Sequence, residues 1–126
     1  MTTKETTAPQ SIALPVLDAG ETYAGLTIHN NTPMHLVLLP GDHDDATWKK
    51  AKAWAEELGG ELPSRIDLLV LWQNLPGAFQ KEWYWSGETH ASYESNAWYQ
   101  HFNDGYQGCN SKGIKLRARA VRRLPI

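Results

Sequence analysis

The feature that most constrains the fold of this chain is its C-terminal third, residues 82–124, in which aromatic side chains recur in short alternating runs. The segment reads EWYWSGETHASYESNAWYQHFNDGYQGCNSKGIKLRARAVRRL and holds three of the six tryptophans. Runs of period two that are rich in aromatic residues and separated by turn signals such as Asp104-Gly105 indicate antiparallel strands joined by hairpins. The segment therefore predicts a sheet that displays aromatic side chains, which suits binding more than catalysis.

Two strands are expected near the N-terminus. Residues 23–29 (YAGLTIH) alternate, residues 34–39 (MHLVLL) form a nearly continuous apolar run, and the Asn-Asn-Thr-Pro between them is a strong turn signal. Together they predict an N-terminal hairpin. The apolar stretch at residues 11–17 is broken by Pro15, so it predicts no more than a short edge strand.

A helix is predicted next, because apolar residues fall at helical spacing after residue 45. Either Asp44 or Asp45 is the expected N-cap, since acids suit the positive end of the helix dipole, and Gly59-Gly60 supplies the expected stop. The apolar face comprises Trp48, Ala51, Ala55 and Leu58.

A second helix is predicted to begin at Ser64, which has capping-box spacing with Asp67, and to end at the NLPG of residues 74–77. Alternation then returns, and residues 116–121 (LRARAV) predict one closing strand. In that strand Arg117 and Arg119 share a face and can pair with acids of the helices, which we favour over a nucleic-acid surface. Strands, two helices and strands again define an α+β domain, with both helices packed on mainly antiparallel sheets.

Several of these runs occur in an order typical of a known family. They are the stretch from Trp48 through ELPSR, the helix at residues 67–72, and then YWSGE, AWYQHFNDG and LRARAVR. In this order they resemble the bacterial and phage C-type-lectin-like domains, a family first catalogued as a domain of unknown function. One member forms the C-terminal domain of a collagen-like bacterial adhesin. The resemblance covers residues 25–124.

This resemblance implies a C-type-lectin-like fold in which the N- and C-terminal strands pair and a second, small sheet carries the binding surface. It also implies a phage or prophage origin, with the chain located in a virion or in the bacterial cytoplasm. Within YWSGE, it implies that Trp85 is buried and that Tyr84 lies on the other face of the strand.

Composition argues against several classes of function. With a formal net charge of -2, the chain has no overall positive field for nucleic acid or an anionic membrane. No apolar run reaches the ~20 residues that span a bilayer, and the polar N-terminus lacks the apolar middle of a signal peptide. Residues 1–11 are predicted as a flexible lead, or alternatively as a segment that docks on a partner chain, and residues 12–126 as one domain.

Two groups of acidic residues suggest metal sites, and each has a simpler alternative. The DHDD run at residues 42–45 offers carboxylates and imidazole, yet adjacent side chains rarely converge on one ion, so helix capping is favoured. The ESN of residues 94–96 and the ND of residues 103–104 are similar to the paired calcium-binding tracts of sugar-binding C-type lectins. Because Ser95 stands where proline is usual there, a plain turn is favoured. We expect no cofactor and no metal, with calcium as the alternative left open.

Catalysis through the single cysteine is the remaining enzymatic interpretation. Cys109 with His101 or His90 could in principle form a nucleophile and a base. The same broad fold includes the formylglycine-generating enzymes, but these need a pair of cysteines. With one cysteine and no serine in a nucleophile elbow, we expect that the chain is not an enzyme.

The aromatic residues divide into two groups. Trp48, Trp54 and Trp72 lie on helix faces and are predicted to be core. The aromatic residues after residue 92 lie in loops and short strands, where they either contact a ligand or close the sheet's own core. The residues predicted to bind a ligand are Tyr93, Trp98, Tyr99, His101, Asn103, Tyr106 and Asn110.

The sequence thus predicts a non-enzymatic ligand- or protein-binding domain of phage or prophage type. Its expected partner is a protein or carbohydrate on a host surface, or another virion protein. Neither nucleic acid nor a membrane is expected as a partner. The alternative is a structural subunit of a phage particle that associates with itself as a homo-oligomer.

Overall fold

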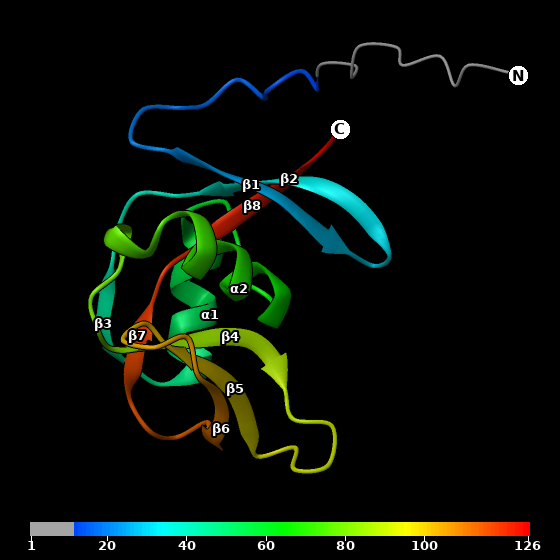
Figure 1. The fold of residues 1–126 in the computed structure, drawn as a ribbon. Coiled ribbons are helices and arrows are strands. Elements are labelled where there is room, and N and C mark those ends of the chain that lie inside the picture. The colour runs from blue at the N-terminus through cyan, green and yellow to red at the C-terminus, as the bar shows by residue number, and fades with distance from the viewer. Residues whose placement is uncertain (1–11) are drawn as a thin grey trace, which may run out of the picture.

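The computed structural model describes residues 12–126, which form an α+β domain of two sheets and two helices (Figure 1). The lead predicted at residues 1–11 lies outside the described residues. The smaller sheet has the strand order β1-β2-β8, with β1 at Thr22–His29, β2 at Thr32–Leu38 and β8 at Val121–Pro125. The larger sheet has the order β3-β7-β4-β5-β6, with β3 at His43–Ala46, β7 at Leu116–Ala118, β4 at Trp83–Thr89, β5 at Asn96–His101 and β6 at Gln107–Ser111.

The predicted N-terminal hairpin is confirmed. β1 and β2 pair antiparallel, and the turn between them is made by Asn30 and Asn31, whose φ angles of 51° and 60° are those that asparagine tolerates in a two-residue hairpin turn. β2 also pairs antiparallel with β8, so the C-terminal strand joins the N-terminal hairpin through its second strand, and β1 and β8 do not pair directly. The short strand predicted at residues 11–17 is wrong for residues 12–17, which belong to no strand.

Two α-helices connect the sheets, α1 at Trp48–Glu57 and α2 at Arg65–Asn74, and a short 3₁₀ turn follows at Pro76–Ala78. The capping box of α2 is confirmed, because Ser64 and Asp67 each accept a hydrogen bond from the other's backbone N–H. The acidic cap predicted for α1 is wrong. Thr47 is the N-cap, and the preceding acids belong to β3, which pairs with β7 from the far end of the chain. Neither helix is long and apolar enough, within residues 12–126, to cross a membrane.

The two helices lie on opposite faces of the larger sheet. α2 lies between the two sheets (Figure 1), where Leu68 and Leu71 pack with Leu36 of β2, with Tyr84 of β4 and with Phe102 in the turn after β5. α1 covers the other face through a second apolar cluster, formed by Ala51, Ala55, Trp85, Ala97 and Tyr99. The expected burial of Trp85 is confirmed, and Tyr84 is buried on the opposite face. Trp48, Trp54 and Trp72 pack against these clusters but remain half-buried, at the rim of the core.

The C-terminal arginine-rich segment forms two strands in different sheets. The single strand predicted at residues 116–121 is wrong, because the chain leaves β7 after Ala118 and enters β8 at Val121. β7 also runs parallel to β4, with Arg117 opposite Tyr84, so the larger sheet is mixed and combines this parallel pair with the antiparallel pairs that were mainly expected. Arg119 lies between the two strands and donates to the backbone carbonyls of Leu39 and Ala78.

Candidate functional site

An exposed tryptophan lies at the end of the larger sheet where β4 begins. Trp83 is the first residue of β4, and 38% of its surface is exposed. Its ring stacks on the buried ring of Tyr99, with 4.8 Å between centroids and an interplanar angle of 3°. Tyr99 in turn packs so closely on Gly108 that a Cβ there would lie 2.8 Å from the tyrosine hydroxyl. The indole therefore rests on a fixed support instead of moving freely in solvent.

A shallow hollow of about 260 Å³ lies on one side of this indole. We call its lining residues the Trp83 shelf, which comprises Trp83, Tyr99, His101, Asn103, Asp104 and Tyr106. His101 lies opposite Trp83 in the β4–β5 register, and its ring meets the indole edge-on with 5.6 Å between centroids. Nδ1 of His101 accepts the N–H of Asn103, so the neutral ring carries its proton on Nε2. The shelf thus combines flat aromatic surface with polar side chains at its rim.

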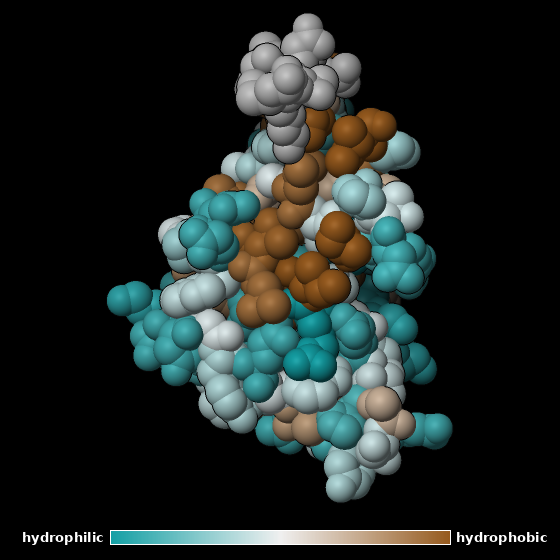
Figure 2. All heavy atoms as spheres, turned by 45° about the vertical axis from the view of Figure 1, so that its right-hand side comes forward, coloured by the Kyte–Doolittle hydropathy of each residue, from teal (hydrophilic) through white to brown (hydrophobic). Residues whose placement is uncertain are grey.

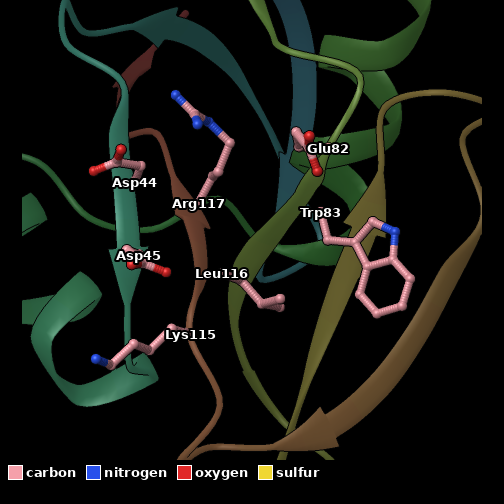
Figure 3. A pocket seen from close by; sticks show the side chains of 7 residues that line it. All are labelled: Asp44, Asp45, Glu82, Trp83, Lys115, Leu116 and Arg117. Atoms are coloured by element: carbon pink, nitrogen blue, oxygen red, sulfur yellow. The ribbon is translucent and has the colours of Figure 1, made fainter.

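A second hollow, of about 420 Å³, lies on the other side of Trp83. Figure 3 shows its lining residues, which are Asp44 and Asp45 of β3, Glu82 and Trp83 at the start of β4, and Lys115, Leu116 and Arg117 between them. The pairing of β3 with β7 is irregular here, and Asp45 has a φ of 53°, which turns this acidic stretch out of a regular ladder. Within residues 12–126, Asp44, Asp45 and Glu82 form no ion pair.

The residues predicted to bind a ligand lie on both faces of the larger sheet and do not form one surface. Tyr99 and His101 lie on the face that carries the Trp83 shelf, with Asn103 and Tyr106 in the turn beyond them. Asn110 lies opposite Ala97 on the same face, two residues along β6 from the glycine under Tyr99. Of this group, Tyr99 is buried and has a pKa raised by burial, so it supports the shelf from below.

The other two predicted residues belong to a cluster on the opposite face. The guanidinium carbon of Arg65 lies 3.5 Å from the centroid of the Trp98 indole, and the ring of His90 stacks on it at 5.0 Å. Tyr93 lies 5.0 Å from His90 and donates its backbone N–H to Nδ1 of that histidine. Trp98 is therefore covered by its neighbours, whereas Tyr93 stays exposed at the loop.

Trp83 itself was not among the predicted binding residues. Alternation correctly places Trp83 on the same face as Trp85. It does not show that α1, the helix that covers this face, leaves Trp83 exposed. One feature of the sequence could have indicated that Trp83 is exposed. It is the first residue of a strand and directly follows the charged Lys81 and Glu82, and strand ends next to charged residues lie at the edge of the core.

The geometry also bears on the catalytic and metal alternatives. Cys109 lies opposite Trp98, on the face turned toward α2, whereas His101 points to the other face. His90 stacks on Trp98 and so lies on the same face as Cys109. The calcium-like tracts at residues 94–96 and 103–104 stand at opposite ends of β5, a six-residue strand that spans roughly 17 Å. No group of three or more potential metal-ligating side chains was found in the part of the chain that the structure describes.

The C-terminal arginines are held by partners within the domain. Arg117 pairs with Asp42 in the β2–β3 loop at 3.2 Å, and Arg122 pairs with Glu21 at 2.7 Å. The predicted pairing of Arg117 and Arg119 with helix acids is wrong, because Arg119 donates to main-chain carbonyls and Arg117 to a loop acid. These contacts hold the three arginines within the fold, although the Nε of Arg119 is buried and has no hydrogen-bond partner within residues 12–126.

No protein-family model matches this chain, and no curated protein matches it.

Proposed function

We propose that this chain is a binding domain, without catalytic chemistry, whose Trp83 shelf holds a ligand carried by another molecule. The observation that carries the proposal is the stacked pair of Trp83 and Tyr99. A large apolar ring kept at the surface loses the burial that would stabilise it in a core. Because the ring is fixed from below, it loses little conformational entropy when a ligand covers it, and such preorganisation favours affinity.

The ligand class that fits this surface best is a carbohydrate. A sugar ring has an apolar face of C–H groups, which can lie flat on the indole of Trp83, and hydroxyl groups around its edge. Asn103, Asp104 and His101 stand at the rim of the shelf and can exchange hydrogen bonds with such hydroxyls. A peptide side chain could cover the indole as well, but it would leave most of these polar groups without a partner.

The biological setting belongs to the same proposal. The ordered motifs from Trp48 to LRARAVR resemble C-type-lectin-like domains of bacteria and phages, so we propose a phage or prophage protein of that fold. Its ligand would then be a carbohydrate on the surface of a bacterial host, or a glycan-bearing protein there.

An array of bacterial surface glycans tests the proposal, followed by calorimetric titration with the best ligand. Trp83→Ala and Tyr106→Ala should each weaken binding by about tenfold or more, as expected for aromatic residues at the centre of a contact. Both side chains are exposed enough for the variants to keep their fold, which circular dichroism would verify.

Tyr93→Ala is the matched control, because Tyr93 and Tyr106 are 62% and 63% exposed and lie on opposite faces of the sheet. It should bind like the unmodified chain. The shelf is the wrong site if the folded Trp83→Ala and Tyr106→Ala variants retain full affinity. The carbohydrate class is wrong if no glycan binds.

A further inference from the structure

The smaller sheet has an outer face, turned away from α2, that is apolar near the hairpin end. Thr27 and Leu36 point inward and are buried, so the alternate residues Leu26 and Ile28 point outward, and both are exposed. Ile28 lies opposite Pro33 of β2. On the other side of β2, Pro125 lies opposite Met34, so Ile126, the next residue, is close to Pro33. The outer face therefore carries aliphatic side chains from β1 and from the end of β8.

Residues 12–17 add to this surface. They run extended beside the smaller sheet (Figure 1), and Arg122 on the outer face of β8 donates a hydrogen bond to the carbonyl of Val16. Ile12, Leu14 and Val16 alternate along this segment, and all three are exposed, Val16 to 89%. Figure 2 shows hydrophobic residues, coloured brown, gathered in a continuous patch in the upper half of the view.

The size of this surface matches that of a protein interface. We call it the outer apolar patch, and it consists of Ile12, Leu14, Val16, Leu17, Leu26, Ile28 and Ile126. With between 37% and 89% of each residue exposed, the seven together present on the order of 700 Å², close to the ~800 Å² that each partner contributes to a standard interface. A patch of that size on a free monomer is unusual and marks an interaction site.

We propose that the outer apolar patch binds the same patch on a second copy of this chain, forming a two-fold symmetric dimer. All seven side chains of the patch are aliphatic, and the charges of Arg122 and Glu21, which lie beside it, neutralise each other. Such a surface offers nothing to a charged partner and requires an uncharged apolar one. A two-fold axis brings a patch onto its own copy, so the chain itself supplies the complementary surface.

The preceding residues of the same chain do not meet this requirement. Residues 1–11 read MTTKETTAPQS, in which threonine and charged residues predominate, so burying them against an aliphatic surface would cost the hydration of their polar groups. The dimer does not depend on the proposed ligand site. Leu26 and Ile28 of the patch lie on the smaller sheet, whereas Trp83 lies on the larger one.

Size-exclusion chromatography with light scattering, over a range of protein concentrations, tests the dimer. The unmodified chain should have twice the monomer mass, and Leu26→Lys should shift it to the monomer by raising the dissociation constant at least tenfold. Leu58→Lys is the matched control, because Leu58 is 42% exposed at the end of α1 and Leu26 is 44% exposed. This control should remain dimeric, as should Trp83→Ala.

Val16→Lys provides a second variant that cannot act through unfolding, because Val16 lies outside every helix and strand. It too should dissociate the dimer. The proposal is overturned if the unmodified chain stays monomeric when its concentration is raised 100-fold, or if its mass is that of a trimer. It is also overturned if both Leu26→Lys and Val16→Lys remain dimeric. Dissociation of Leu58→Lys to the same extent would also overturn it.

Discussion

Replacing the buried Asp67 by asparagine tests what joins α2 to the smaller sheet. Asp67 is fully buried, and its two oxygens accept hydrogen bonds from three residues. Oδ1 accepts the hydroxyl of Thr27 at 2.5 Å, while Oδ2 accepts the backbone N–H of Ser64 at 2.9 Å and the guanidinium of Arg123 at 2.5 and 2.9 Å. One carboxylate thus holds β1, β8 and the first turn of α2 together.

The size of the effect follows from what asparagine can and cannot accept. Its carbonyl can still accept from one neighbour, but its NH₂ group would face the donors of Arg123 or of Ser64. The side chain of Arg123 is 5% exposed. The variant removes its buried carboxylate partner and leaves only the exposed Glu61, which costs about 3–5 kcal/mol. In a domain of this size, that corresponds to a melting temperature lower by roughly 12–20 °C.

Urea and thermal unfolding followed by circular dichroism measure this loss. Glu61→Gln is the matched control, because Glu61 also pairs with Arg123 but has a side chain that is 60% exposed. An exposed pair contributes about 0–1 kcal/mol, so this control should unfold nearly as the unmodified chain does. The reasoning is refuted if Asp67→Asn costs less than about 1 kcal/mol, or if the two variants are equally destabilised.

Two further predictions concern single positions. Gly105 has a φ of 81°, and an added Cβ would lie 2.8 Å from the indole nitrogen of Trp72, so Gly105→Ala should lower the unfolding free energy by about 2 kcal/mol or more. Gly59→Ala, with a similar φ and nothing within 4 Å, should lose only about 1 kcal/mol in the same urea titration. Equal losses would contradict the clash with Trp72. Burial and the hydrogen bond to Asp42 raise the pKa of Tyr84 from 10 to about 12. Because the folded state holds this proton more tightly than the unfolded state, stability should fall between pH 10 and 12 but not below that window. Tyr84→Phe should remove this fall from the pH dependence of the urea midpoint, and an unchanged profile would exclude Tyr84 as its source.

The features that the sequence predicts correctly are those whose cause is local. Two asparagines set the hairpin turn before β2, and the reciprocal cap of Ser64 with Asp67 lies within one helical turn. Each signal is complete within a few residues, so no distant partner can override it. The burial of Trp85 is different, because its prediction came from the resemblance and not from the period of the strand alone.

The features that the sequence fails to predict depend on partners far along the chain. The acids before α1 suit a helix N-terminus, yet pairing of His43 with Ala118 draws them into a strand. The alternation of LRARAV continues through Arg119 and Ala120, so nothing local marks the change from one sheet to the other. The solvent exposure of Trp83 likewise depends on how much of the larger sheet α1 covers.

The division of the C-terminal segment between two sheets also has a consequence for how the chain folds during synthesis. β7 fills the position between β3 and β4, and β8 is the third strand beside the hairpin of β1 and β2. While residues 116–125 remain in the ribosome exit tunnel, the larger sheet lacks an interior strand, and a lone two-stranded hairpin is only marginally stable in water. The nascent chain therefore gains its cooperative structure only after its last strands emerge. A premature stop in this stretch leaves both sheets incomplete, with their apolar faces exposed to aggregation.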